Sequence, residues 1–283
     1  MTDASVGGVT PPQLPLALFM GDFNVGKSAL INALLRRETV LSTREESRAL
    51  PTFVARSAQR EARYVALPRD RSGLEAKSHE EFMEVRRDVG GACPYGAMGA
   101  ALPGGPFSRL VLVDTPGMSS DLSESVRLSR LPGQESVLFV AVADIEYWSA
   151  RHTLDFMAHH HELFGGAMLI VGNKADHLNA EEIRRIRDKA PVRLERYGIA
   201  PPPRFFALSA RLELARGLPH NEYRRRVKQE VRELCDGDFD ALRVALYEFE
   251  AAQSAESGCQ SFKQLLQTPL ATALIQTPEV SAV

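Results

Sequence analysis

The sequence predicts an α/β fold with a mostly parallel central sheet and helices on both faces. Short continuous apolar runs recur along the chain, and such runs are typical of strands buried on both faces of a parallel sheet. Segments with helical spacing of apolar residues lie between these runs, which favours alternating strands and helices. With 44% hydrophobic residues, the 283-residue chain can bury a core of this kind.

The first half of the chain is less regular than the second. Its apolar patterns predict four elements: a strand at 14–20, a helix at 29–37, a strand at 63–67 and a short helix at 79–88. Residues 38–56 show no clear period, so we expect a loop there. Residues 90–106 are rich in glycine and alanine, and we expect a mobile, low-complexity segment.

Strand and helix patterns alternate regularly in the second half. Apolar runs predict strands at 110–113, 136–142, 167–171 and 204–208, and apolar spacing predicts helices at 150–164 and 180–197. The second helix opens with Asn179 and Glu182, which have the spacing of a capping box. Two apolar stripes predict two final helices, one through Tyr223, Val227, Val231 and Leu234 and one through Phe239, Leu242, Leu246 and Phe249.

The composition excludes several classes of protein. A formal net charge of −2 argues against a protein that coats nucleic acid, so we expect no nucleic-acid partner. The three cysteines are scattered, which fits a reducing compartment, and the sequence shows neither a signal peptide nor a membrane-spanning apolar run. We therefore expect a cytoplasmic protein. The run His159, His160 and His161 cannot converge on one metal ion from a helix, and we expect a solvated face.

The first chemical motif is a phosphate loop. Residues 21–28 read G-D-F-N-V-G-K-S, which matches G-x-x-x-x-G-K-[ST] between a strand and a helix, the Walker A pattern. The glycines let the backbone turn so that successive N–H groups face phosphates, the lysine reaches the β- and γ-phosphates, and the serine hydroxyl reaches Mg²⁺. The residues expected to contact the nucleotide here are Gly21, Asn24, Val25, Gly26, Lys27, Ser28 and Ala29.

A second motif, D-T-P-G, directly follows the strand predicted at 110–113. An acidic side chain at the carboxyl end of this strand, Asp114, can hold Mg²⁺ through a water molecule. The backbone N–H of Gly117 can bind the γ-phosphate. The sequence therefore predicts that this motif lies beside the phosphate loop.

A third motif, N-K-A-D, stands at the end of a later predicted strand. Asp176 can accept hydrogen bonds from the ring N–H and the exocyclic amine of guanine, a pair of donors that adenine lacks. Lys174 can lay its stem over the base, and Asn173 can tie this loop to the phosphate loop. Ser209 and Ala210 follow the last predicted strand, where a backbone N–H can bind the guanine oxygen.

With these motifs in order, residues 15–252 resemble the P-loop GTPases. The stretches GDFNVGKSALINALL, Leu50-Pro51-Thr52 and VDTPGM followed by SVLFVAVAD are similar to the bacterial dynamin-like GTPases. The N-V-G-K-S core equally resembles the Era-like GTPases, which is the alternative. The long interval between Thr52 and Asp114 favours the dynamin-like assignment, since ribosome-assembly GTPases have a much shorter one.

The resemblance implies a catalytic set and a metal site. Lys27, Thr52 and Asn24 would be catalytic, and Ser28, Thr52 and Asp114 would hold Mg²⁺. Thr39 and Thr43 remain alternatives for the switch I threonine. Asn24 stands where several potassium-activated GTPases hold K⁺ beside the phosphates, the alternative being a purely structural asparagine. Arg44 and Arg48 are either arginine fingers or surface arginines, and Met118 replaces a glutamine that orients water in Ras-like enzymes.

The function expected from the resemblance is that of a Mg²⁺-dependent GTPase that switches between GTP and GDP forms and is activated by a second copy or a partner. The alternatives are a nucleotide-gated binding module with little hydrolysis and an Era-like ribosome or RNA factor. The expected domains are a flexible leader at 1–14, a GTPase domain at 15–252 with inserts at about 53–109 and 211–237, and a tail at 253–283. Because that tail is too short for a dynamin stalk, we expect a homodimer through the nucleotide face or a stalk-bearing partner, with recruitment to a membrane.

Overall fold

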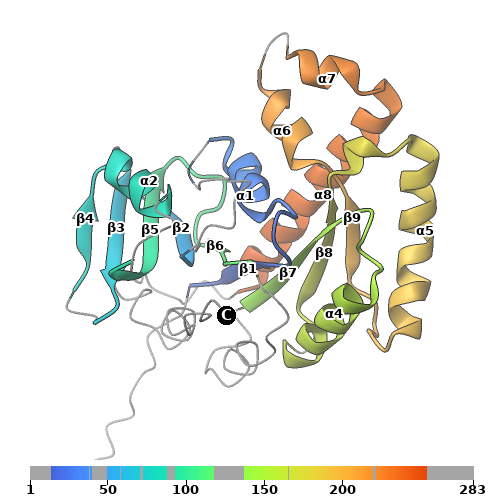
Figure 1. Ribbon diagram of the computed structural model, residues 1–283, viewed down its shortest axis with the longest axis horizontal. Helices are drawn as coiled ribbons and strands as arrows, with labels where there is room; N and C mark the ends of the chain where they lie inside the picture. The colour runs from blue at the N-terminus through green and yellow to red at the C-terminus, as the bar shows by residue number, and fades with distance from the viewer. Residues whose placement is uncertain are drawn as a thin grey trace, which may run out of the picture.

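The computed structural model describes residues 14–37, 39, 50–57, 59–70, 73–87, 93–117, 137–164, 166–218 and 221–253. Within them, nine strands form one sheet in the order β4-β3-β5-β2-β6-β1-β7-β8-β9 (Figure 1). Five of the pairings are parallel and three are antiparallel. The predicted α/β fold with a mostly parallel sheet is therefore confirmed.

The elements have the following bounds. The strands are β1 Leu16–Met20, β2 Thr52–Ser57, β3 Arg63–Pro68, β4 Glu75–Lys77, β5 Tyr95–Pro103, β6 Val111–Asp114, β7 Val137–Asp144, β8 Met168–Asn173 and β9 Arg204–Ala207. The helices are α1 Lys27–Leu35, α2 His79–Arg87, α4 Arg151–Leu163, α5 Ala180–Arg196, α6 Ala210–Arg216, α7 Glu222–Arg226 and α8 Gln229–Ala252, with a 3₁₀ turn η2 at Ala175–His177.

Strand β1 lies at the centre of the parallel half of the sheet. It pairs in parallel with β6 on one side and with β7 on the other, and all five of its residues are buried. A continuous apolar sequence suits this position because both faces of the strand are covered by helices. The carboxyl ends of β1, β6, β7 and β8 consequently meet at one edge of the sheet, where ligands of open α/β sheets bind.

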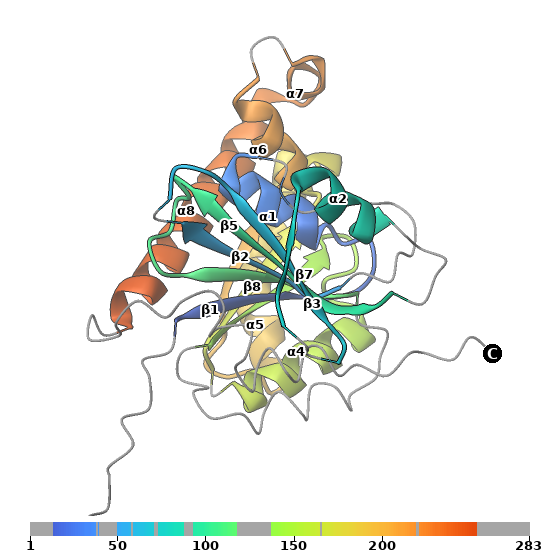
Figure 2. The ribbon, with the colours of Figure 1, turned by 90° about the vertical axis from the view of Figure 1, so that its left-hand side faces the viewer.

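The helices divide between the two faces of the sheet. Leu30 and Ile31 of α1 and Phe239 of α8 pack in one apolar cluster with alternate residues of the strands. Met157 of α4 and Leu194 of α5 pack in the cluster on the opposite face. Figure 2 shows this arrangement, with α1 and α6 above the sheet and α4 and α5 below it.

Strands β2 to β5 extend the sheet beyond the parallel half, and they correct two expectations. The loop expected at 38–56 contains the start of β2, and the mobile segment expected at 90–106 contains β5, the longest strand described. Strand β5 pairs with β2 on one side and β3 on the other, so its backbone groups are satisfied despite its glycines and alanines. Pairing within the sheet outweighs a composition that by itself predicts irregular structure.

The carboxyl-terminal helices also differ from the prediction. The two apolar stripes do not mark two helices, because Val231 to Phe249 belong to the single long helix α8, while Tyr223 lies in the short helix α7. The capping box at the start of α5 is present, with the Asn179 side chain accepting from the Glu182 N–H and the Glu182 side chain accepting in return. The sequence did not predict the short elements β4 and α6.

A buried carboxylate fixes α8 against the sheet. Asp238 of α8 accepts a hydrogen bond from the N–H of Ala207 at 2.7 Å and forms an ion pair with Arg187 of α5 at 3.0 Å. Burial raises the pKa of Asp238, while these two donors act in the opposite direction. The contact holds the end of β9, from which the chain enters the loop with Ser209 and Ala210.

Several expectations concern residues outside those described. They are the leader before residue 14, the tail after residue 253, Thr43, Arg44, Arg48 and Met118. Among the described residues, no helix combines the length and the apolar character needed to cross a membrane.

The histidine run is not a solvated face as expected. His160 is fully buried against Phe139, and its ring Nδ1 lies 2.8 Å from the carbonyl oxygen of Phe156. The pKa of His160 is lowered to about 4, mainly by burial and to a smaller extent by His159, while the contact with the Phe156 carbonyl oxygen acts in the opposite direction. Among the described residues, no three or more histidine, cysteine, aspartate or glutamate side chains form a group that could hold a metal ion.

This buried histidine predicts a loss of stability in mild acid. Its pKa is about 4 in the folded chain and 6.5 in the unfolded chain, so the unfolded state binds more protons between these values and stability falls as pH falls through that window. The free energy of unfolding in urea should decrease by about 2 kcal/mol from pH 7.5 to pH 5 through this group. His160→Phe should remove that part of the decrease, and an unchanged pH dependence in the variant would contradict the assignment.

Candidate nucleotide-binding site

The loop between β1 and α1 can form only with glycine at two positions. Gly21 has φ 153°, and a Cβ added there would lie 1.9 Å from the carbonyl oxygen of Val142 in β7. Gly26 has φ 93°, and a Cβ there would lie 2.3 Å from the Asn173 amide nitrogen. The two glycines therefore let the loop approach both β7 and β8 closely.

Lys27 places its ammonium group inside this loop. The Nζ atom donates to the carbonyl oxygens of Gly21 at 2.9 Å and Asp22 at 2.8 Å. Burial lowers the pKa of Lys27, and the carboxylates of Asp114 and Asp22 act in the opposite direction. A cation enclosed by a phosphate loop attracts the phosphate oxygens of a nucleotide.

Three of the residues predicted to hold Mg²⁺ lie together. The Ser28 hydroxyl donates to Oδ2 of Asp114 at 2.8 Å, and Thr52 is the cross-strand partner of Asp114 in the β2–β6 pairing. The Thr52 hydroxyl donates to the carbonyl oxygen of Leu50 at 3.0 Å. Hydroxyl and carboxylate oxygens are the ligands that Mg²⁺ prefers, so these side chains fit the ion.

The rival threonine Thr39 has a different environment. Its backbone N–H donates to the Asn32 side chain at 2.9 Å beyond the end of α1. The structure thus brings Thr52, and not Thr39, into register with Asp114. The choice of Thr52 as the metal ligand stays a prediction.

Two other predicted residues lie at the mouth of the loop. Gly117, after β6, packs under Phe23, because a Cβ on Gly117 would lie 2.4 Å from the Phe23 ring. Asn24 is exposed and has φ 57°, a left-handed conformation that asparagine adopts more readily than most residues. This conformation is sufficient reason for an asparagine here, and its role toward K⁺ stays a prediction.

Asn173 joins the phosphate loop to the loop after β9. Its amide nitrogen donates to the Val25 carbonyl oxygen at 2.8 Å, and its amide oxygen accepts from the N–H of Ala210 at 3.0 Å. Ser209 caps α6 by accepting from the N–H of Leu212 at 3.2 Å. The predicted tie between the N-K-A-D loop and the phosphate loop is therefore present. The sequence did not predict the contact with Ala210, which engages the Ala210 N–H.

Lys174 and Asp176 of the N-K-A-D motif contact partners that the sequence did not predict. Lys174 has φ 67°, and its Nζ lies 2.7 Å from Oδ2 of Asp144 at the end of β7. Asp176, in the turn η2, accepts a hydrogen bond from the Tyr223 hydroxyl of α7. Asp144 had a detectable signal, an acidic residue closing the apolar run of β7, whereas nothing in the sequence separated Tyr223 from a core tyrosine.

The close approach at Gly21 predicts a severe effect of a single methyl group. Gly21→Ala should destabilise the protein by several kcal/mol, because the obstructing atom belongs to the backbone of β7 and cannot turn away. Gly73→Ala is the matched control, since Gly73 has φ 149° and nothing within 4 Å of an added Cβ. Urea unfolding of both variants measures the difference. Equal losses would show that the backbone conformation, and not the contact with Val142, makes glycine necessary.

Comparisons with known proteins agree with this geometry. The family described as "50S ribosome-binding GTPase" matches residues 17–174, more than half of the chain. No curated protein matches the sequence. Two solved chains of an oligomerised bacterial dynamin pair, described as sensing and tethering membranes, share the fold with a TM-score of 0.54 and identities of 17% and 16%.

Each dynamin match covers 84% of this chain and 36% of the other, so the chain spans about a third of the length of those dynamins. The family match runs from β1 through the phosphate loop to Lys174, the second residue of the N-K-A-D motif. The chain thus belongs to the P-loop GTPase family that is described as 50S ribosome-binding GTPases.

Proposed function

We propose that this protein binds guanine nucleotides and hydrolyses GTP with Mg²⁺ as a dynamin-like molecular switch. The tie made by Asn173 carries the proposal, because it holds a phosphate loop and a base-recognition loop at a fixed separation. A nucleotide needs both loops at once. The family match supports GTP and GDP as the ligands.

The roles of the residues at the phosphates follow from their placement. Lys27, enclosed in the loop, stabilises the negative charge that develops on the β- and γ-phosphate oxygens. Ser28 and Thr52 would offer hydroxyl oxygens to Mg²⁺, and Asp114 would support the ion from beside them. Mg²⁺, when bound, neutralises phosphate charge. The Gly117 N–H lies beyond the end of β6 and binds the γ-phosphate.

Base selection rests on Asp176. A carboxylate in this position accepts hydrogen bonds from both N–H groups on one edge of guanine, and adenine presents no such pair. Lys174, held in place by Asp144, covers one face of the base with its stem. The protein therefore distinguishes GTP from ATP by two charge-assisted hydrogen bonds.

The dynamin-like part of the proposal concerns activation. Phe23 has 38% of its surface exposed, and it stands with the exposed Asn24 at the mouth of the phosphate loop, where a second copy can contact it. The strands β2 to β5 account for the long interval between Thr52 and Asp114 that favours this assignment. We propose that a second copy or a stalk-bearing partner completes the site, and that the partner brings the protein to a membrane.

Turnover measurements test this proposal. GTP hydrolysis per molecule should rise with protein concentration, because dimerisation completes the site, and it should be faster in K⁺ than in Na⁺ if Asn24 holds the cation. Lys27→Ala should lower the rate at least about a hundredfold. Lys189→Ala, on the exposed face of α5, is the matched control. Phosphate release with GTP and with ATP gives each rate.

The outcomes separate the alternatives. Tight GTP binding without turnover would support a nucleotide-gated binding module. Turnover independent of protein concentration would contradict activation by dimerisation, and equal rates in the two salts would contradict the role of Asn24 toward K⁺. Stimulation by anionic vesicles would support membrane recruitment, and stimulation by ribosomes would favour the Era-like alternative.

Asp176→Asn tests base selection separately. The amide should weaken GTP binding at least about a hundredfold, because its NH₂ group cannot accept from guanine. The same NH₂ group can donate to the 2-oxo group of xanthine, so the variant should prefer xanthosine triphosphate. Asp188→Asn, on the exposed face of α5, is the control. Competition between the two nucleotides for a fluorescent analogue measures the preference, and an unchanged preference for GTP would exclude Asp176 as the base-reading residue.

A further inference from the structure

The carboxylate of Asp176 is covered by a side chain from another part of the chain. Only 3% of the Asp176 side chain is exposed, and its Oδ2 atom accepts a hydrogen bond from the Tyr223 hydroxyl. His177 also approaches this oxygen, at 3.5 Å. A guanine base needs free access to both carboxylate oxygens, so it cannot bind Asp176 while Tyr223 occupies this position.

Arg211 contacts the ring of Tyr223 and helps to hold this side chain at the carboxylate of Asp176. The Arg211 guanidinium lies 3.6 Å from the centre of the Tyr223 ring, which is a close cation–π contact. Burial, and then the hydrogen bond to Asp176, raise the pKa of the Tyr223 phenol. The hydroxyl is therefore a proton donor throughout the physiological pH range, as guanine N–H groups are.

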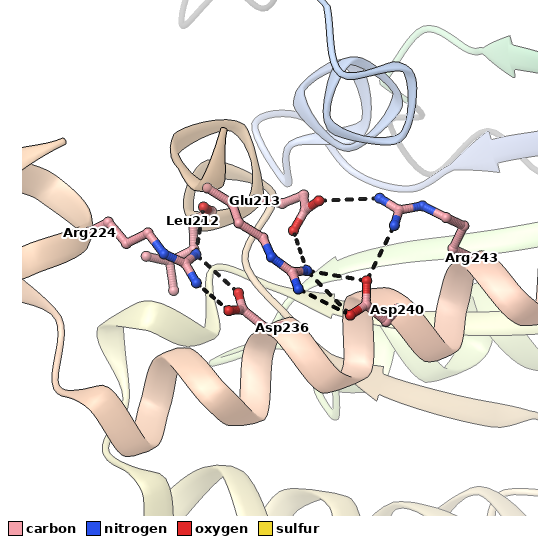
Figure 3. A network of polar contacts seen from close by, with 7 residues as sticks. Leu212, Glu213, Arg224, Asp236, Asp240 and Arg243 are labelled. Atoms are coloured by element: carbon pink, nitrogen blue, oxygen red, sulfur yellow. Dashed lines mark hydrogen bonds and ion pairs between the residues drawn. The ribbon is translucent and has the colours of Figure 1, made fainter. Parts of the chain in front are cut away.

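Besides the contacts of Tyr223, helix α7 is attached to its neighbours through Arg224. Arg224 donates to the carbonyl oxygen of Leu212 in α6 and to Oδ1 of Asp236 in α8, both at 3.0 Å, and it forms a second contact with Asp236 (Figure 3). Tyr223 packs, partly buried, against the apolar cluster that includes Leu212 and Val231. Because α7 has no fully buried residue, it can move without opening the core, and it stands with α6 beyond the end of the sheet (Figure 1).

The helices on either side of α7 are fastened more firmly. Glu213 of α6, with 4% of its side chain exposed, forms ion pairs with Arg216 and with Arg243 of α8. Asp240 of α8 pairs with both of these arginines, and Figure 3 shows the resulting network of Glu213, Arg216, Asp240 and Arg243. This network joins α6 to α8 independently of α7. Motion of α7 can thus leave the α6 end of the site in place.

We propose that α7 is a gate on the guanine site, in which Tyr223 competes with the base for the carboxylate of Asp176. The inference rests on the proposed role of Asp176 in reading guanine. In the closed form the tyrosine supplies the hydrogen bond that the base would supply, and opening moves α7 off the carboxylate. Only open molecules bind the base. The apparent affinity is therefore the affinity of the open form multiplied by the fraction of molecules that are open.

The gate acts on the base and not on the phosphates. Since GTP and GDP share the same base, the gate weakens the binding of both by the same factor and does not change the preference between them. It slows association, because the nucleotide waits for α7 to open or displaces it. ATP makes no pair of hydrogen bonds to Asp176, so the affinity for ATP does not change when Tyr223 moves away.

Tyr223→Phe tests the gate, because it removes the hydroxyl and keeps the ring against Arg211. The variant should bind GDP and GTP about tenfold more tightly than the wild type, with faster association, and its weak affinity for ATP should not change. Tyr247→Phe is the matched control, since the Tyr247 hydroxyl donates to the Pro106 carbonyl oxygen on the surface. Stopped-flow measurements with fluorescent GDP and GTP give both rate constants.

A second variant keeps the test independent of the tyrosine itself. Asp236→Asn weakens the attachment of Arg224 and should also speed guanine-nucleotide association, with Asp188→Asn as its control. Weaker GDP binding by Tyr223→Phe would show that Tyr223 positions Asp176 for the base. Either this result or unchanged binding would overturn the gate and would leave the proposed function standing. A wild type that binds ATP as well as GTP would overturn the proposed function, and the gate with it.

Discussion

The candidate site depends on one buried side-chain amide. Asn173 donates to the phosphate loop and accepts from the loop after β9, so both ends of the amide are satisfied and the separation of the two loops is fixed. Gly26 must lack a side chain because a Cβ there would collide with this amide. The central strands supply the rest of the geometry, since β1 and β8 both end at the edge where Asn173 lies.

The polar groups of the site are already paired with one another. Lys27 donates to carbonyl oxygens of its own loop, Ser28 to Asp114, and Lys174 pairs with Asp144. A bound nucleotide would replace these contacts and not simply add to them, so the affinity is a difference between two sets of hydrogen bonds. The contact between Tyr223 and Asp176 belongs to the same set. It differs in coming from a short helix without a fully buried residue, so it can be exchanged without opening the core.

The sequence predicted the parallel half of the fold well and the other half poorly, for a physical reason. Strands such as β1 and β7 are buried on both faces and read as continuous apolar runs. Strand β5 has glycines and alanines, and only its two neighbours in the sheet make it a strand. The glycines of the phosphate loop and the tie made by Asn173 were predictable because backbone geometry restricts them, whereas the role of Asp176 in reading the base stays a prediction. Tyr223 was not predictable, since its contact with Asp176 joins distant segments and has no local pattern.

Strand β2 gives the fold a mechanical property. Thr52, proposed to hold Mg²⁺, is the first residue of a strand that is hydrogen-bonded to β6 on one side and to β5 on the other. A threonine in such a strand cannot move alone as one in a free loop can. Any displacement of Thr52 that keeps these pairings would be shared with β5 and β6, so the nucleotide site is coupled mechanically to the outer half of the sheet.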